Sequence, residues 1–190
     1  MSQTSRLTIP PPLSLYIHIP WCVKKCPYCD FNSHEHKETQ NFTDMESIYV
    51  DALIKDLEYS LPKIWGRKIH SIFFGGGTPS LFSGKTIHKI LSQVRALTPI
   101  LYDAEITLEA NPGTIDTNHF EGYKDAGVTR VSLGIQSFND THLKSLGRIH
   151  NSLDAKKGIE IAMHYFDEVM RTLNLNSPHQ NDASQFQCLF

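Results

Sequence analysis

Two periodicities of apolar residues alternate along this chain. Four stretches with apolar residues at every second position, or in short continuous runs, are typical of β-strands: 13–19, 69–74, 104–110 and 128–136. Between and after them, apolar residues recur every three or four positions, which predicts amphipathic helices. The helices are expected from Thr43 to Pro62, around Ile87–Val94, from about Asp116 to Gly127, and from about Ser152 to Phe166.

Local signals set the ends and faces of these helices. Residues 43–46, Thr-Asp-Met-Glu, have the form of a capping box. Pro62 is expected to end the first helix because proline lacks the N–H that the helix needs. The buried stripe of the first helix is expected to include Ile48, and that of the last helix Met163.

Strands that alternate with helices predict a parallel sheet. Four such units amount to half of a (β/α)₈ barrel, so we expect an α/β fold, an incomplete parallel (β/α) barrel with about four units, in residues 13–166. Residues 1–12 are polar and end in three prolines, which predicts an extended lead-in. From Asp167 the chain is polar and rich in Asn and Gln and contains no convincing buried strand, so we expect residues 167–190 to form a disordered or non-native tail.

Composition narrows the class of protein. The 190 residues are 40% hydrophobic and 20% charged, with a formal net charge of −2, which is typical of one globular domain. Since no basic run is present, no nucleic-acid partner is expected. No apolar run is long enough to span a membrane, and no signal peptide precedes the clustered cysteines, so we expect the cytoplasm.

Three of the four cysteines form one cluster, Cys22, Cys26 and Cys29. Thiolates at this spacing can hold one metal centre, and on a four-iron cluster they would ligate three irons and leave the fourth open. A structural zinc ion is the alternative; it needs a fourth protein ligand. Candidates for that ligand are His34, His36 and Cys188. Inert thiols are a third interpretation, whereas a disulfide framework is not expected because three clustered cysteines cannot pair among themselves.

Other candidate residues lie where the predicted strands end. The cysteine loop follows the first strand, a glycine run at 75–77 follows the second, Glu109 closes the third and Gln136 the fourth. In a parallel barrel these carboxyl ends share one face, which carries the active site. Glycines let the backbone approach a ligand and present its amide groups, although a tight turn would need them as well. Glu109 could accept hydrogen bonds from an ammonium group or ribose hydroxyls, or it could be a solvated surface carboxylate.

The cysteine loop resembles the signature of a known superfamily. Residues 16–22, Tyr-Ile-His-Ile-Pro-Trp-Cys, followed by Cys26 and Cys29, look like the motif of radical S-adenosylmethionine (SAM) enzymes. The similarity runs from about Leu13 to about Phe166, through several separate motifs. It implies a [4Fe-4S] cluster on the three cysteines, SAM on the open iron, and reductive cleavage of SAM to a 5′-deoxyadenosyl radical. It also implies a partial barrel, which in the superfamily usually holds six units.

The resemblance also assigns residues to SAM. Tyr28 would stack on the adenine, the glycine loop would hold the amino end of SAM, and Arg148 matches a family motif in which it could clamp a carboxylate. Taken alone, Gln136 and Arg148 would more often be structural. The full set of implied SAM contacts is Tyr16, Tyr28, Gly76, Gly77, Thr78, Glu109, Gln136 and Arg148.

Within the superfamily, the branch of oxygen-independent coproporphyrinogen III oxidases and radical-SAM heme chaperones is the most similar. The oxidases carry a further cysteine two residues after the third, where this chain has Phe31, as the chaperones do. We therefore favour a heme-chaperone-like protein that binds SAM and, in its full-length relatives, heme for transfer to an acceptor protein, with a separate electron donor. Alternatives are a coproporphyrinogen III dehydrogenase of porphyrin biosynthesis and a non-catalytic zinc-stapled or inactive fragment, so the sequence leaves open whether the protein is an enzyme.

The resemblance stops near Phe166. The family would place a fifth strand there that ends in Tyr-(Gly/Ala)-Leu-Pro, and this segment is missing from the chain. The family's later His-Asn-x-x-Tyr-Trp heme motif is missing as well. We therefore expect a C-terminally truncated relative with a frame-altered tail.

Overall fold

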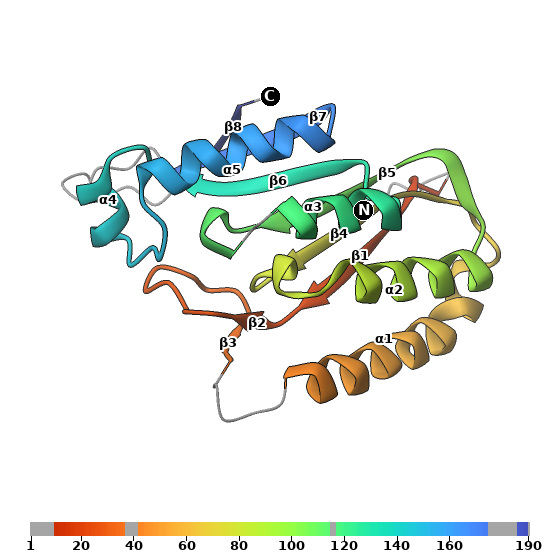
Figure 1. The fold of residues 1–190 in the computed structure, drawn as a ribbon. Helices are drawn as coiled ribbons and strands as arrows, with labels where there is room; N and C mark the ends of the chain where they lie inside the picture. The colour runs from red at the N-terminus through yellow and green to blue at the C-terminus, as the bar shows by residue number, and fades with distance from the viewer. Residues whose placement is uncertain (1–9, 37–41, 115–116, 175–185, 190) are drawn as a thin grey trace, which may run out of the picture.

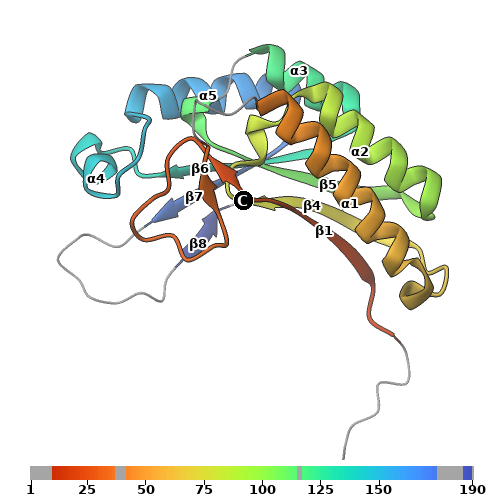
Figure 2. The same cartoon turned by 90° about the horizontal axis from the view of Figure 1, so that it is seen from below.

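A computed structural model describes residues 10–36, 42–114, 117–174 and 186–189. This part of the chain forms one curved six-stranded sheet in the order β1-β4-β5-β6-β7-β8, with helices packed on one of its faces (Figures 1 and 2). The strands are β1 (Leu13–Ile19), β4 (Ile69–Gly76), β5 (Ile100–Ala110), β6 (Arg130–Gln136), β7 (Glu168–Asn174) and β8 (Phe186–Leu189). All neighbouring pairs from β1 to β7 are parallel, and β8 is antiparallel to β7.

The connections between the parallel strands contain helices, as predicted. They are α1 (Phe42–Ile64), α2 (Gly84–Leu97), α3 (Thr117–Ala126) and α5 (Ser152–Tyr165). The order of the strands in the sheet follows their order in the chain, so the α/β fold with a partial parallel barrel is confirmed. No described helix is both long and apolar enough to cross a membrane.

The two faces of the sheet differ in polarity, which explains the alternation in the sequence. Side chains such as Ile17, Phe74 and Leu108 point toward the helices and are at most 5% exposed. The opposite, concave face carries partly exposed side chains from the intervening positions, including Tyr16 and Glu109. The helices therefore cover an apolar face, and the polar face lines the interior of the partial barrel.

Helix α2 shows how local sequence and packing agree. The Ser83 side chain accepts a hydrogen bond from the Thr86 amide and caps the first turn. Four apolar side chains of this helix are buried, as its periodicity predicted: Ile87, Ile90, Leu91 and Val94.

Three local predictions for the helices were wrong. Pro62 does not end α1, because it lies within the last turn, where its missing N–H removes a single hydrogen bond and the helix continues to Ile64. Ile48 is 72% exposed, since α1 turns Val50 toward the sheet instead. Met163 is 64% exposed, whereas Ala155 and Ala162 form the buried side of α5.

The expectation that no strand follows Phe166 was also wrong. Strand β7 lies parallel to β6, with Arg130 opposite Glu168 and Val131 opposite Val169. Although the sequence of β7 is mostly polar, two of its side chains, Val169 and Leu173, pack against the core. Residues 1–9, which are most of the expected lead-in, and residues 175–185 and 190, which are half of the expected tail, lie outside the described residues.

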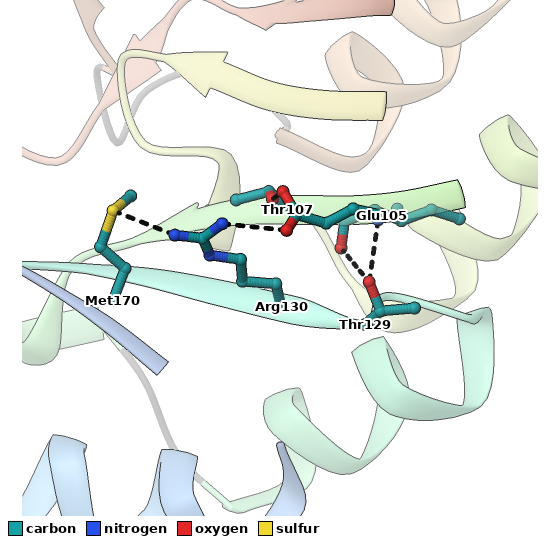
Figure 3. Close-up of polar contacts among 6 residues, drawn as sticks. Glu105, Thr107, Thr129, Arg130 and Met170 are labelled. Atoms are coloured by element: carbon teal, nitrogen blue, oxygen red, sulfur yellow. Dashed lines mark hydrogen bonds and ion pairs between the residues drawn. The ribbon is translucent and has the colours of Figure 1, made fainter. Parts of the chain in front are cut away.

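A polar network on the concave face connects three strands (Figure 3). Arg130 on β6 forms an ion pair of 2.9 Å with Glu105 on β5, and its other terminal nitrogen lies 3.4 Å from the Met170 sulfur on β7. Thr107 donates a hydrogen bond of 2.9 Å to the same Glu105 carboxylate. Side-chain contacts of this kind are not visible in a hydropathy pattern, so the sequence analysis missed the attachment of β7.

Several short elements were also not predicted. Strands β2 (Trp21–Cys22) and β3 (His34–Glu35) pair in parallel within the cysteine loop. Two 3₁₀ turns, η1 (Pro79–Leu81) and η2 (Pro112–Thr114), follow β4 and β5, and a short helix α4 (Asp140–Ser145) follows β6. These elements lie at the carboxyl ends of the strands and shape that end of the sheet.

Helices α2 and α3 touch through a pair of glycines, which generates a stability prediction. A Cβ on Gly84 would lie 2.6 Å from the Gly122 Cα, which is backbone and cannot rotate away. We therefore expect Gly84→Ala to lower the free energy of unfolding by about 1–3 kcal/mol through overpacking. Urea denaturation would measure this change in the free energy of unfolding. The neighbouring exposed Lys85→Ala serves as control, and an equal loss in both variants would contradict the packing argument.

Candidate functional site

The predicted site residues converge at one edge of the sheet. Strands β1, β4, β5 and β6 end at Ile19, Gly76, Ala110 and Gln136, and their parallel pairing places these ends on the same side. The cysteine loop and α4 lie at this side, toward which the strand arrows point in Figure 1. The convergence expected from the strand order is therefore confirmed.

The cysteine loop and the glycine loop are in direct contact. The Gly77 amide donates to the Ile19 carbonyl and the Thr78 amide to the Trp21 carbonyl, both at 2.7 Å. A Cβ on Gly77 would lie 2.6 Å from the Trp21 carbonyl oxygen and 3.0 Å from the Cys22 Sγ. Only glycine fits this position, so the run after β4 serves a close approach and not merely a turn.

The three clustered cysteines are free thiols. Cys22 is buried at the end of β2, whereas Cys26 and Cys29 are half-buried and joined by a turn in which the Cys29 amide donates to the Cys26 carbonyl at 3.0 Å. Among the described residues, no group of three or more His, Cys, Asp or Glu side chains is gathered around one point where a single metal ion could bind. Cysteines that ligate a four-iron cluster bind three different irons, so they do not need to meet at one point. Three unpaired thiols on one loop beside amide donors fit that group.

The candidate fourth ligands of the zinc alternative lie at different places. His34 is exposed on β3. His36 is partly buried, with its ring 4.8 Å from that of Phe42, and its Nδ1 is a buried atom for which the described structure shows no hydrogen-bond partner. The side chain of Cys188 lies outside the described side chains.

Lys25 and Glu35 hold the cysteine loop in shape, and the sequence analysis did not identify them. The Lys25 Nζ donates to the carbonyl oxygens of Phe31 and Ser33, both at 3.1 Å. The Lys25 amide donates to the Glu35 carboxylate at 2.9 Å. Lys25, which lies between the first and second cysteines, is therefore bonded to the residues that follow the third cysteine and to β3. In the sequence, the position of Lys25 between two clustered cysteines was the one feature that could have indicated this role.

Aromatic side chains support the base of the loop. The ring of Trp21 lies 4.7 Å from that of Tyr49 and 5.9 Å from that of Phe82. The Tyr49 hydroxyl donates to the His18 carbonyl at 2.7 Å. Helix α1 thus fixes both the end of β1 and the residue before Cys22.

Tyr16 and Glu109 face each other across the glycine run on the concave side. A Cβ on Gly75 would lie 2.9 Å from the Tyr16 ring and 3.2 Å from a Glu109 carboxylate oxygen. Burial raises the pKa of Glu109, and a hydrogen bond from the Gly76 amide opposes this rise. Burial and the negative charge of Glu109 raise the pKa of Tyr16. The Tyr16 hydroxyl lies 3.1 Å from the Nδ1 of His18, a further residue that was not predicted as part of the site.

Gln136 is strained and its side-chain oxygen is unsatisfied. Its φ is 66°, in the left-handed region, which costs a non-glycine residue roughly 1–2 kcal/mol. The residue is 9% exposed, and its Oε1 is buried without a hydrogen-bond partner in the described structure. Strain together with an orphaned acceptor is typical of a functional site, where a ligand hydroxyl or ammonium would supply the missing donor.

Arg148 reaches from the segment after α4 to the cysteine loop. Its Nη1 donates to the Cys26 Sγ at 3.3 Å and its Nη2 to the Gly134 carbonyl at 2.9 Å. Burial raises the pKa of the Tyr28 hydroxyl, which lies near Cys26 and Arg148, to about 12. The structure therefore brings Arg148 to the cysteine loop, although it lies 122 positions after Cys26 in the sequence.

Comparisons with known proteins agree with this arrangement. Residues 16–184 match the model of the Radical SAM superfamily. The heme chaperone HemW of Haemophilus influenzae is 53% identical over 157 residues, which are 80% of this chain and 40% of that protein. HemW of Escherichia coli is 50% identical over 169 residues, 89% of this chain and 43% of that protein. The chain thus spans about two fifths of the length of these curated relatives.

A solved structure shows the same fold. Coproporphyrinogen III oxidase (HemN) from Escherichia coli, described as a radical SAM enzyme, superposes with a TM-score of 0.73 at 27% sequence identity. The similarity covers 83% of this chain and 36% of the oxidase. The described sheet and helices therefore correspond to part of a radical SAM barrel.

The loop contacts of Lys25 generate a first prediction for the site. Lys25→Met keeps the apolar stem but leaves the Phe31 and Ser33 carbonyls without the ammonium donor. We expect hydrogen exchange of the amides of residues 26–33 to accelerate about tenfold, because a hydrogen bond to a charged group contributes about 1.5–3 kcal/mol. Mass spectrometry of peptides would measure it. The adjacent exposed Lys24→Met is the control, and unchanged exchange in Lys25→Met would show that the lysine does not shape the loop.

The raised pKa of the partly buried Glu109 generates a second prediction. A carboxyl group whose pKa is raised above its ordinary 4.5 stabilises the folded state at lower pH and loses this contribution as pH rises through the folded-state pKa. Glu109→Gln carries no titrating group, so its free energy of unfolding should increase relative to the parent protein between pH 4 and pH 7. Urea denaturation at several pH values would measure this. In the control Glu121→Gln, at an exposed position, the free energy of unfolding should change with pH as it does in the parent protein. The same pH dependence in Glu109→Gln would show that burial does not raise the pKa of Glu109.

Proposed function

The chain belongs to the radical SAM superfamily, and from this premise we propose that it acts as the cluster- and SAM-binding part of a heme chaperone. Membership implies a [4Fe-4S] cluster and SAM as cofactors. The observation that carries the proposal is the contact between the cysteine loop and the glycine loop, where the Cys22 Sγ lies against Gly77. A cluster on the cysteines and a ligand on the glycine loop would be neighbours there.

The proposal assigns a role to each group of residues. Cys22, Cys26 and Cys29 would hold the cluster. The glycine loop with Gly76, Gly77 and Thr78, together with Glu109, Gln136 and Tyr16, would hold and orient SAM, and Tyr28 would border the adenine. When bound, the two cofactors supply one-electron chemistry. The protein supplies orientation and a partly buried site.

The chaperone function is supported by the similarity to HemW proteins and by Phe31. This residue is 55% exposed, two positions after Cys29, where the coproporphyrinogen oxidases would carry a fourth cysteine. The similarity in fold to the oxidase HemN supports oxidation of coproporphyrinogen in porphyrin biosynthesis as the second candidate. Heme transfer would require an acceptor protein, and reduction of the cluster would require an electron donor. Three free thiols fit a reducing compartment such as the cytoplasm.

Anaerobic reconstitution with iron and sulfide tests the cofactor assignment. The parent protein should hold about four irons and four sulfides per chain, as expected for a [4Fe-4S] centre, and should release 5′-deoxyadenosine with dithionite and SAM. Each of the variants Cys22→Ala, Cys26→Ala and Cys29→Ala should lose most of the iron. Cys188→Ala is the matched control and should keep it. A colourless protein that contains zinc, or iron retained after Cys22→Ala, would overturn the assignment.

Titration with hemin separates the two candidate functions. A chaperone should shift the Soret band of hemin in proportion to the protein added and should leave coproporphyrinogen unchanged. Turnover of coproporphyrinogen under reducing conditions would favour the oxidase. A reconstituted protein that neither binds hemin nor converts coproporphyrinogen would contradict both functions for this chain.

A further inference from the structure

The end of β6 is bonded to side chains of the segment that follows α4. The Arg148 Nη2 donates to the Gly134 carbonyl at 2.9 Å, and the His150 Nε2 lies 3.0 Å from the Ile135 carbonyl oxygen. The regular pairing of β6 with β5 extends only to Leu133. Two side-chain donors therefore hold the backbone of β6 beyond the point where its ladder with β5 stops.

The Ile135 carbonyl is the centre of a strained turn. It also accepts a hydrogen bond of 2.8 Å from the Ser137 amide. This bond spans only Gln136, whose φ of 66° is typical of the rare and strained form of the γ-turn. The turn holds the residue whose buried Oε1 has no hydrogen-bond partner in the described structure.

The orientation of the Ile135 carbonyl determines the backbone conformation of Gln136. This carbonyl and the Gln136 amide belong to one planar peptide group, so rotation of the group changes the φ of Gln136. A flip of the peptide group would let Gln136 return to a negative φ, which a residue with a Cβ prefers. The bond from His150 holds the carbonyl from outside the turn and therefore opposes the flip.

The imidazole of His150 has this carbonyl as its hydrogen-bond acceptor. The residue is 3% exposed. Because a carbonyl oxygen can only accept, the Nε2 must carry the hydrogen. Burial and the positive charge of Arg148 lower the pKa of His150, which favours the neutral ring. The neutral ring then has no second N–H to satisfy, and its Nδ1 is buried without a hydrogen-bond partner in the part of the chain that the structure describes.

The backbone on either side of the imidazole is fixed. The next residue, Asn151, begins α5 with a capping box, in which its side chain accepts from the Leu153 and Asp154 amides, both at 2.9 Å. A Cβ on Gly113 of η2 would lie 3.3 Å from the His150 Cβ. His150 is thus held between η2 and the start of α5, in place before any ligand binds.

We propose that His150 is a positioning residue, which holds Gln136 in its left-handed conformation through the Ile135 carbonyl so that the Gln136 side chain is ready to bind SAM. This inference rests on the proposed function, because it takes Gln136 as one of the residues that contact SAM. His150 needs no contact with SAM for this role. The strained turn exists before binding, so SAM does not have to induce it.

The affinity of the reconstituted protein for SAM, measured by anaerobic calorimetry, tests the proposal. His150→Met removes the donor, so the turn relaxes and has to be formed again on binding, and we expect the Kd to rise about tenfold. His150→Gln places an amide N–H near the position of the Nε2 and should return the Kd to within about threefold of the parent value. His88→Met, at an exposed position on α2, is the control and should leave the Kd unchanged.

A double variant tests whether His150 acts through Gln136. Gln136→Ala lacks the side-chain oxygen that the turn positions. Adding His150→Met to Gln136→Ala should therefore raise the Kd by less than about twofold. A further tenfold increase in the double variant would show that His150 acts independently of Gln136 and would overturn the proposal.

Hydrogen exchange of the SAM-free protein tests the turn itself. The Ser137 amide should exchange about tenfold faster in His150→Met than in the parent protein and near the parent rate in His150→Gln, while the amides of β4 and β5 change little. Equal acceleration in β4, β5 and the turn would make His150 a general stabilising residue and contradict a positioning role.

The outcomes separate this inference from the proposed function. A parent protein that binds no SAM would contradict the proposed function, and exchange of the Ser137 amide would still decide whether His150 holds the turn. A parent protein that binds SAM, together with a His150→Met variant that binds it equally well, would leave the proposed function intact and show that the inference is wrong.

Discussion

The site depends on a backbone-to-backbone contact between the ends of β1 and β4. Parallel pairing places Ile19 opposite Gly76, and the chain continues from there as the cysteine loop on one side and the glycine loop on the other. Two hydrogen bonds of 2.7 Å, from the Gly77 and Thr78 amides, then join the loops. Any side chain at Gly77 would collide with the Trp21 carbonyl, so the contact excludes every residue except glycine. The positions of the cysteines relative to the other strand ends follow from this contact.

Several residues at the strand ends are kept in states that reduce stability. Glu109 is a partly buried carboxylate with a raised pKa, Gln136 combines a positive φ with a buried unsatisfied oxygen, and the Nε of Arg148 is buried without a hydrogen-bond partner in the described structure. Each arrangement has a cost, because polar groups removed from water need partners. Strained residues and unsatisfied polar groups of this kind cluster at functional sites, where a bound ligand supplies the missing partners. The three residues come from β5, β6 and the segment after α4, so their shared location points to one site.

The concave face explains how a chain that spans about two fifths of its curated relatives still forms an ordered sheet. The helices bury the apolar face, while Glu105, Thr107 and Arg130 give the interior face polar contacts that tolerate water. The same network reaches β7 through Met170 and extends the sheet beyond the four predicted strands. The interior of the barrel is thus polar below the candidate site, and the apolar core lies entirely on the helix side.

The sequence by itself determined the four strands β1, β4, β5 and β6, most of the helix faces and the cysteine trio. Alternating positions such as Ile106 and Leu108, and the spacing of Cys22, Cys26 and Cys29, depend on near neighbours in the chain. Strand order also predicted that the motifs meet at one edge, because parallel strands end on the same side. Only the tertiary structure decided which groups touch: Arg148 with Cys26, Gly147 with Pro27, and Arg130 with Met170. It also decided that α1 turns Val50 inward instead of Ile48, and that a polar stretch becomes β7. These outcomes depend on contacts between residues far apart in the chain, whose energies no local pattern of polar and apolar positions records.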